Sequence, residues 1–391
     1  MDEFGTSRTM NKKTLLEILE EVPDCRSGNA IRHLLKDILM IGLLCVICNG
    51  DTFTDMELFG QTHEGILRQF LALPYGIPSH DVFRSVFGKL DPEALKKGFG
   101  AWTDSLRDEI QGHTISIDGK TIRGSQNGTI KAKHIVSAFA SDAQLVLGQL
   151  AVDEKSNEIT AIPKLLELFC VKGNTITIDA MGTQREIAGI INRKGGDYIL
   201  ALKENQPSVY TDIRLYFEQD VLPSPKAILK SEGRYAHTFE KGHGRIETRE
   251  CFLISDISWL PDKSQWPGLI GAACIRSKRI LLPTEKESIS DRFFLFSCSD
   301  MTADRLLSLQ RGHWAIENQL HWCLDMTFHE DSSRARMENA AEVLDILRKL
   351  ALQLMKQETS VKGSLRNKRL RCGYDVFYAF KVLGVNPVSY V

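Results

Sequence analysis

Hydrophobic positions follow two different periods along this chain, and the change comes close to residue 110. Before it, apolar residues recur at helical spacing, first in 14–21 and then through the long apolar stretch 30–48. Asp91 and Pro92 are typical of the N-cap and the first position of a further helix. We therefore expect an α-helical N-terminal domain over residues 1–108.

From Thr114 onward the apolar residues alternate with polar ones and are often β-branched, which favours strands. The pattern predicts strands over 114–118, 134–139, 145–152, 175–179 and 197–202, with helices over 159–169 and 185–193. Three strands, a helix, a strand, a helix and a strand is the element order of the ribonuclease H-like fold. We expect an α/β core of this fold over 109–360, with a β-rich insertion at about 220–300 and a basic C-terminal tail over 361–391.

Composition adds little to this picture. Hydrophobic residues make up 43% of the chain and charged residues 25%, which is typical of a globular protein with a real core. The net charge of −1 means that any surface for a polyanion must come from local clusters of Lys and Arg. The longest strongly apolar run, 38–48, is too short to span a bilayer, so we expect a cytoplasmic protein with no membrane partner.

Two acidic residues follow predicted strands, Asp118 after the first and Asp179 after the fourth. In the expected topology these strands are neighbours, so the two carboxylates should meet at one edge of the sheet. Carboxylates from separate elements suit Mg²⁺, which can support phosphodiester cleavage. Each Asp taken singly also fits a turn or a helix cap.

A third carboxylate should come from a helix, and Glu317 is the leading candidate. His313, Glu317 and His321 recur every four residues and therefore share one helix face. That face could be a metal site in its own right, or its histidines could contact phosphate or pack against a neighbour, with Trp314 and Trp322 in the core. Other candidates for the third ligand remain: Asp325, Glu330 and Asp331.

Cations near these acids could hold a phosphate, although ordinary surface charge explains them almost as well. They follow the first and fifth predicted strands, flank Glu317 and cluster between Lys362 and Arg371. They also alternate along 241–249, which we expect to be one extended segment with its charges on a single face. The residues predicted to contact DNA are Lys120, Arg123, Lys203, Asn205, His243, Arg245, Arg311, His313, Lys368, Arg369 and Arg371.

Several longer motifs occur together in one order: SIDGK at 116–120, DAMGTQ at 179–184, GDYILALK at 196–203, HGRIE at 243–247 and HWAIEN at 313–318. With these motifs the chain resembles, nearly end to end, bacterial insertion-sequence transposases of the H-repeat-associated protein family. The resemblance implies a helical domain of the kind associated with DDE transposases, followed by the catalytic domain.

The same resemblance implies that Asp118, Asp179 and Glu317 form a triad for Mg²⁺ or Mn²⁺. It also implies cleavage and strand transfer of double-stranded DNA at insertion-sequence ends, by a homodimer on DNA that is nucleoid-associated when bound. The broader cut-and-paste group places Tyr, Arg and Lys around the Glu, where this chain has Gln310, His313 and Leu324. The alternative is an inactive or domesticated DNA-binding or recombination protein that does not transpose.

Overall fold

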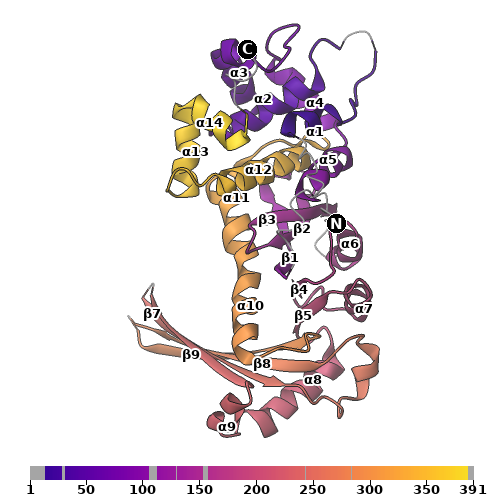
Figure 1. Cartoon of the computed structure of the whole chain (residues 1–391), viewed down its shortest axis with the longest axis vertical. Helices are drawn as coiled ribbons and strands as arrows, with labels where there is room; N and C mark the ends of the chain where they lie inside the picture. The colour runs from indigo at the N-terminus through magenta and orange to yellow at the C-terminus, as the bar shows by residue number, and fades with distance from the viewer. Residues whose placement is uncertain are drawn as a thin grey trace, which may run out of the picture. The chain divides into compact units, whose positions relative to one another are not determined.

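The computed structural model describes residues 14–28, 31–104, 112–128, 130–152, 157–242, 244–282 and 284–385. The chain divides into two compact units along its length, and Figure 1 labels their elements. The first unit takes residues 1–108, 122–132 and 324–391, and the second takes 109–121 and 133–323. The predicted domain ranges differ from this division because residues beyond 324 join the N-terminal helices instead of the sheet.

The first unit is helical, as the period of its hydrophobic residues predicts. Its α2 is buried on all sides because it is apolar all round, and α12 packs against it. Side chains of Thr14 and Thr52 cap α1 and α3 in capping boxes. The helices are α1 (Leu15–Glu20), α2 (Leu35–Ile47), α3 (Phe53–Leu67), α4 (His80–Lys89), α5 (Pro92–Asp104), α12 (Ala340–Gln357), α13 (Leu365–Tyr374) and α14 (Val376–Leu383), while α11 (Trp322–Met326) spans the division along the chain.

Residues predicted as a basic tail form α13 and α14, which pack against α12 and α2. Apolar positions in α14, among them Phe380 and Leu383, are buried there. The many cations of 362–371 favour the prediction of a basic tail, so the sequence pattern does not indicate that these residues form packed helices.

The second unit contains a nine-stranded sheet in the order β3-β2-β1-β4-β5-β9-β8-β7-β6. β1 and β5 each pair in parallel with β4, while β2 and β3 are antiparallel. This half of the sheet has the ribonuclease H-like order, which confirms the predicted fold class. The elements are β1 (Thr114–Ile122), β2 (Lys133–Ala140), β3 (Leu145–Val152), α6 (Glu158–Leu165), β4 (Thr175–Ile178), α7 (Arg185–Arg193) and β5 (Asp197–Leu202).

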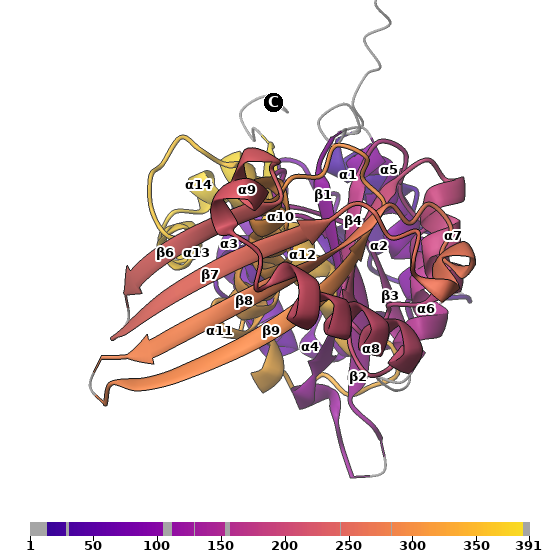
Figure 2. The same cartoon turned by 90° about the horizontal axis from the view of Figure 1, so that it is seen from below.

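The predicted β-rich insertion is confirmed, and its strands continue the same sheet. β9 pairs antiparallel with β5, and long antiparallel hairpins carry the sheet onward (Figure 2). The elements are α8 (Pro207–Tyr216), α9 (Lys226–Ser231), β6 (Tyr235–Gly242), β7 (Arg245–Ile254), β8 (Gly271–Leu281) and β9 (Lys286–Phe296), followed by α10 (Ala303–Ala315).

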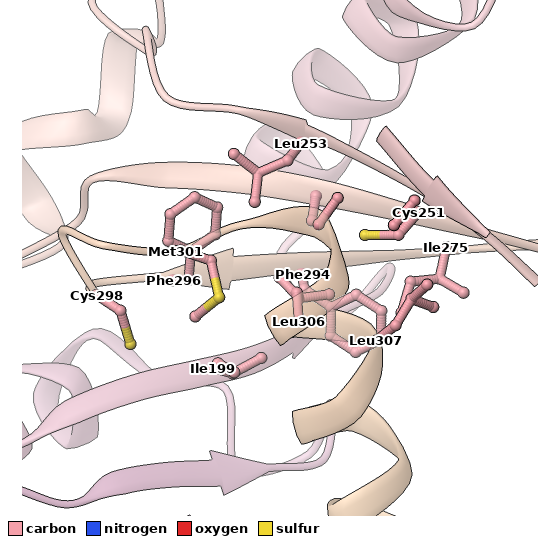
Figure 3. Close-up of a cluster of buried hydrophobic side chains, with 13 residues drawn as sticks. Ile199, Cys251, Leu253, Ile275, Phe294, Phe296, Cys298, Met301, Leu306 and Leu307 are labelled. Atoms are coloured by element: carbon pink, nitrogen blue, oxygen red, sulfur yellow. The ribbon is translucent and has the colours of Figure 1, made fainter. Parts of the chain in front are cut away.

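A hydrophobic cluster joins α10 to this added half of the sheet. Leu306 and Leu307 from α10 lie against Cys251, Ile275 and Phe294 from β7, β8 and β9 (Figure 3). The cluster fixes the helix, and with it the residues that follow Ala315, on one face of the sheet. Among the helices whose residues the structure describes, none is both long and apolar enough to cross a membrane.

Candidate active site

The pairing of β1 with β4 brings the two predicted acids together. Ile117 pairs with Ile178 at the last position of the parallel register, and Asp118 and Asp179 are the next residues along the chain, the first still within β1 and the second just past the end of β4. β1 continues to Ile122, so the prediction that this strand ends at Asp118 is wrong. Only its pairing with β4 ends there, and this leaves both carboxyl groups at the place where the two strands part.

Asp118 lies in an unfavourable place for a negative charge. Burial raises the pKa of Asp118 to about 7, and the charges of Asp179, Glu158 and Glu317 raise it further, against a lowering by the Gly119 N–H. Glu317 thus lies close enough to act on Asp118, which supports its grouping with the two Asp residues. The rivals Asp325, Glu330 and Asp331 belong to the other compact unit, and Glu330 is fully buried there.

Glu317 is exposed and lies in a π-helical segment, Ile316–His321, that continues α10. Such π-helical turns are often found at functional sites. The flanking histidines lie toward the two strands that carry the acids: His313 Nδ1 is 2.9 Å from Thr177 Oγ1, and His321 Nδ1 is 3.6 Å from Asp118 Oδ2. The helix face predicted from the four-residue spacing therefore borders β4 and β1.

His313 lies where a charged ring is disfavoured. Burial lowers the pKa of His313, although the charge of Asp179 opposes the shift. The ring instead closes a short hydrogen-bond chain in which Thr177 donates to Ser116 Oγ at 3.1 Å. This arrangement suits a residue that positions the helix better than one that binds phosphate.

The three acids fit a hard divalent cation in type, since all offer oxygen ligands. As they stand, no three His, Cys, Asp or Glu side chains within the described part of the chain are gathered closely enough to hold a metal ion. Burial is the main cause of the raised pKa of Asp118, and the charges of Asp179 and Glu317 add to it. A divalent cation at these oxygen donors would favour the ionised form of Asp118, so in donor type the residues fit the ion.

An open pocket of about 600 Å³ lies beside Asp179 and brings two predicted DNA contacts to it. Lys203 and Asn205, which follow β5, line this pocket together with Tyr210 and Asp291. The Asn205 amide donates to the Ala180 carbonyl and so ties this loop to the residue after Asp179. Lys203 is exposed in the pocket, where its charge faces open solvent.

Other predicted DNA contacts are distributed over both units. Lys120 is half-buried in β1, and Arg123 is exposed in the first unit, 3.6 Å from Asp331. Arg311 forms an ion pair with Glu240, and Arg245 is near Glu247 at 3.7 Å.

The segment 241–249 is a hairpin and not one extended strand. Lys241 pairs with Ile246, and Gly242 with Arg245, so Lys241 and Arg245 lie on opposite faces. The predicted single charged face is therefore wrong for Lys241. His243 lies outside the described residues.

The predicted DNA contact at Arg369 is contradicted by its position. Arg369 is 1% exposed, and its guanidinium donates to the carbonyls of Val46, Thr327 and Gly50 and to Asp51 at 2.7 Å. It joins helices of the first unit from the inside and is not accessible to DNA.

The neighbouring cations have different surroundings. Lys368 donates to the carbonyls of Met355 and Glu358, whereas Arg371 is exposed and lies 4.9 Å from the Tyr378 ring.

Sequence reasoning missed a buried pair beneath Asp118. His134 Nε2 is 2.6 Å from Glu158 Oε1, both side chains are almost fully buried, and His134 Nδ1 is 2.8 Å from Thr121 Oγ1. A Cβ on Gly119 would overlap both members of the pair, so a larger residue beside Asp118 would force the pair to shift. A lone His and a lone Glu on different elements carry no spacing signal in the sequence.

The tryptophans also differ from expectation in part. Trp322 is 57% exposed and therefore lies outside the core, while Trp314 is half-buried with its ring between two arginines.

The family model described as the transposase DDE domain matches residues 111–354, and a DDE_Tnp_1-associated model matches residues 16–103. The chain belongs to the DDE transposase family. The first of these matches covers the sheet and the helix with Glu317, and the second covers the N-terminal helices. The resemblance stated from the sequence motifs is thus confirmed.

Named relatives agree with this membership. "Putative transposase YncI" of Escherichia coli O157:H7 is 37% identical over 96% of this chain and 95% of its own length. "H repeat-associated putative transposase YhhI" of E. coli K12 is 34% identical over 97% of this chain and 100% of its own length. Among solved structures, a piggyBac transposase synaptic complex with hairpin DNA aligns at a TM-score of 0.45 and 11% identity, covering 94% of this chain and 76% of that one.

Proposed function

We propose that this DDE transposase cuts and rejoins DNA at a divalent-metal site formed by Asp118, Asp179 and Glu317. The observation that supports it most is the strand register that leaves Asp118 and Asp179 side by side beyond the β1–β4 pairing, with His321 of the Glu317 segment 3.6 Å from Asp118. A bound Mg²⁺ or Mn²⁺ would activate a water or a 3′-hydroxyl and neutralise charge on the leaving oxygen.

The chain's own residues prepare this site. With a pKa of about 7, Asp118 is protonated in a large fraction of molecules at neutral pH, and it must release that proton to act as a ligand. The Gly182 N–H donates to Asp179 Oδ1 at 3.2 Å and orients that carboxylate. His313 holds the start of the Glu317 segment against Thr177 on β4.

We infer that double-stranded DNA, both element ends and target, is the substrate. Lys203 and Asn205 in the pocket beside Asp179 suit a backbone phosphate, which fixes position without reading sequence. Lys120, Arg245 and Arg311 would add contacts on the same unit, and Arg123, Lys368 and Arg371 on the other. Processing of two ends favours a homodimer on DNA, which sedimentation of the protein with and without an end duplex would test.

The test is nicking of a labelled duplex that carries the element's own flanking ends, in Mg²⁺ or Mn²⁺. We expect wild type to nick at the ends, Asp179→Ala to lose nicking, and Asp220→Ala to behave as wild type because Asp220 is exposed elsewhere on the unit. DNA binding by anisotropy should persist in all three proteins.

Binding without cleavage that is equal in wild type and Asp179→Ala would contradict the proposal. It would leave a DNA-binding protein without transposition, which is the second possibility that the sequence raises. One relative, matched over 20% of this chain, carries the name "Inactive transposase YbfQ".

A further inference from the structure

Arg292 on β9 is a half-buried cation that, among the described residues, contacts an aromatic ring. Its guanidinium lies over the Trp314 ring at 4.8 Å, and it makes no hydrogen bond or ion pair with any residue there. A guanidinium has five donors, and none of those of Arg292 is closed off from solvent, so an anion from outside the chain can reach them. Such a group is suited to receive an anion from outside the chain.

Strand register places Arg292 on the face of the sheet that α10 covers. Arg292 pairs with Ile275, and Ile275 pairs with Cys251, so these three side chains share a face. Ile275 and Cys251 belong to the hydrophobic cluster under α10 (Figure 3). Arg292 therefore lies where that cluster ends and a polar surface begins.

The polar surface beyond the cluster is cationic, and its glutamates already form ion pairs with other arginines. Glu247 lies 2.9 Å from Arg249, 3.5 Å from Arg279 and 3.7 Å from Arg245. Glu240 is shared by Arg249 and Arg311. Two glutamates thus compensate four arginines, and neither is within ion-pair distance of Arg292.

Trp314 holds the unpaired guanidinium in place. The guanidinium groups of Arg292 and Arg249 lie 4.8 and 5.5 Å from the centre of its ring, and such contacts orient flat guanidinium groups. Burial and the charge of Arg249 lower the pKa of Arg292, while the charges of Glu247 and Glu317 raise it. Glu317, three residues after Trp314, is thus close enough to act on Arg292.

We propose that Arg292 binds a backbone phosphate of the DNA strand that enters the site of Asp118, Asp179 and Glu317. The guanidinium fork matches two phosphate oxygens, and a phosphate would fill the donors that the chain leaves open. This inference rests on the proposed function, because it takes DNA as the substrate. The contact positions the strand beside Glu317 and reads no base.

The test uses Arg292→Met, which keeps an apolar side chain over Trp314 and removes the charge. Lys278→Met is the matched control. Lys278 lies on the opposite face of the same sheet, and its ammonium group forms an ion pair with Glu287 at 2.8 Å. The affinity for an end duplex is measured by anisotropy over a range of NaCl concentrations, and nicking is measured in Mn²⁺.

Arg292→Met should weaken DNA binding roughly tenfold to a hundredfold, as expected for a lost charge-assisted pair. It should also lower the slope of log Kd against log salt concentration by the contribution of about one phosphate contact. Lys278→Met should leave this slope unchanged. Without DNA, the Tm of Arg292→Met should equal or exceed that of wild type, because the removed charge has no ion-pair partner among the described residues and is opposed by the charges of Arg249 and Arg279.

Wild-type affinity and salt slope in Arg292→Met would overturn the inference. So would a fall in Tm with a weakened affinity but an unchanged salt slope, since that marks a structural role. A third result would also overturn the inference: inorganic phosphate stabilises wild type but not Arg292→Met, while the variant binds DNA as wild type does. That result would assign the site to a free anion. Absence of nicking by wild type would contradict the proposed function but not this inference, because DNA affinity and its salt dependence still measure the role of Arg292.

Discussion

Asp118 and Asp179 occupy matching positions on neighbouring parallel strands, each one residue beyond the Ile117–Ile178 pair. Burial raises the pKa of Asp118 to about 7, and the charge of Asp179 beside it adds to the effect. Asp118 therefore holds its proton to a higher pH than an exposed carboxyl does.

Stability should fall with rising pH because of Asp118. The folded-state pKa of about 7 lies above the ordinary value of 3.8, so the protonated form favours folding. This contribution is fully present below about pH 4 and is lost as pH rises through about 7, by up to ~4 kcal/mol. Asp118→Asn should thus be more stable than wild type at pH about 8, with a smaller gain at pH about 5. Urea denaturation of both proteins at the two pH values measures this, and an equal gain at both values would contradict it.

Divalent metal should stabilise wild type through the same carboxylates. A ligand present at a hundredfold excess over its Kd adds about 2.7 kcal/mol to the free energy of unfolding. Mn²⁺ should therefore raise the Tm of wild type and of the exposed-site control Asp220→Asn, but not that of Asp179→Asn. A thermal shift of the same size in all three proteins would place the ion elsewhere.

Gly119→Ala should destabilise the sheet unit. A Cβ there overlaps the buried His134–Glu158 pair, and forcing atoms into a packed site costs about 1–3 kcal/mol. Gly242→Ala is the matched control, because nothing lies within 4 Å of a Cβ at that strand position. Calorimetry of both variants measures this, and Gly119→Ala should have the lower Tm. Equal Tm values would show that the His134–Glu158 pair moves aside without cost.

Arg369→Ala should unfold the helical unit more easily without a specific effect on DNA binding. Its guanidinium bridges three carbonyls and Asp51 in the interior, and removing one partner of a buried pair costs about 3–5 kcal/mol. Arg371→Ala, an exposed neighbour on the same helix, should lie within about 0.5 kcal/mol of wild type. A stable Arg369→Ala with weakened DNA binding would restore the predicted surface role.

Much of the fold was predictable because local patterns determine it. Alternation located the core strands, and α7 has the predicted bounds Arg185–Arg193. The order of elements then placed Asp118 and Asp179 on adjacent strands, since parallel neighbours carry their carboxyl ends to one edge. Spacing by four residues also identified the helix face that borders these strands.

Other features depend on contacts between distant residues, which leave no periodic signal. The pairing of β9 with β5 joins positions about one hundred residues apart and makes the insertion part of one sheet. Arg369 looks like surface charge in sequence because its partners, such as Val46 and Thr327, are remote along the chain. The role of Arg292 could not be predicted from sequence, because it depends on contact with Trp314, which is remote along the chain.

The central claim is that Glu317 completes the site of Asp118 and Asp179. The most direct measurement is the rate of Mn²⁺-dependent nicking of an end duplex by Glu317→Gln, compared with Asp325→Asn, a rival ligand nearby in sequence. We predict that Glu317→Gln slows nicking by more than about a hundredfold while Asp325→Asn stays near wild type. Nicking at the wild-type rate by Glu317→Gln, with loss in Asp325→Asn, would contradict the account.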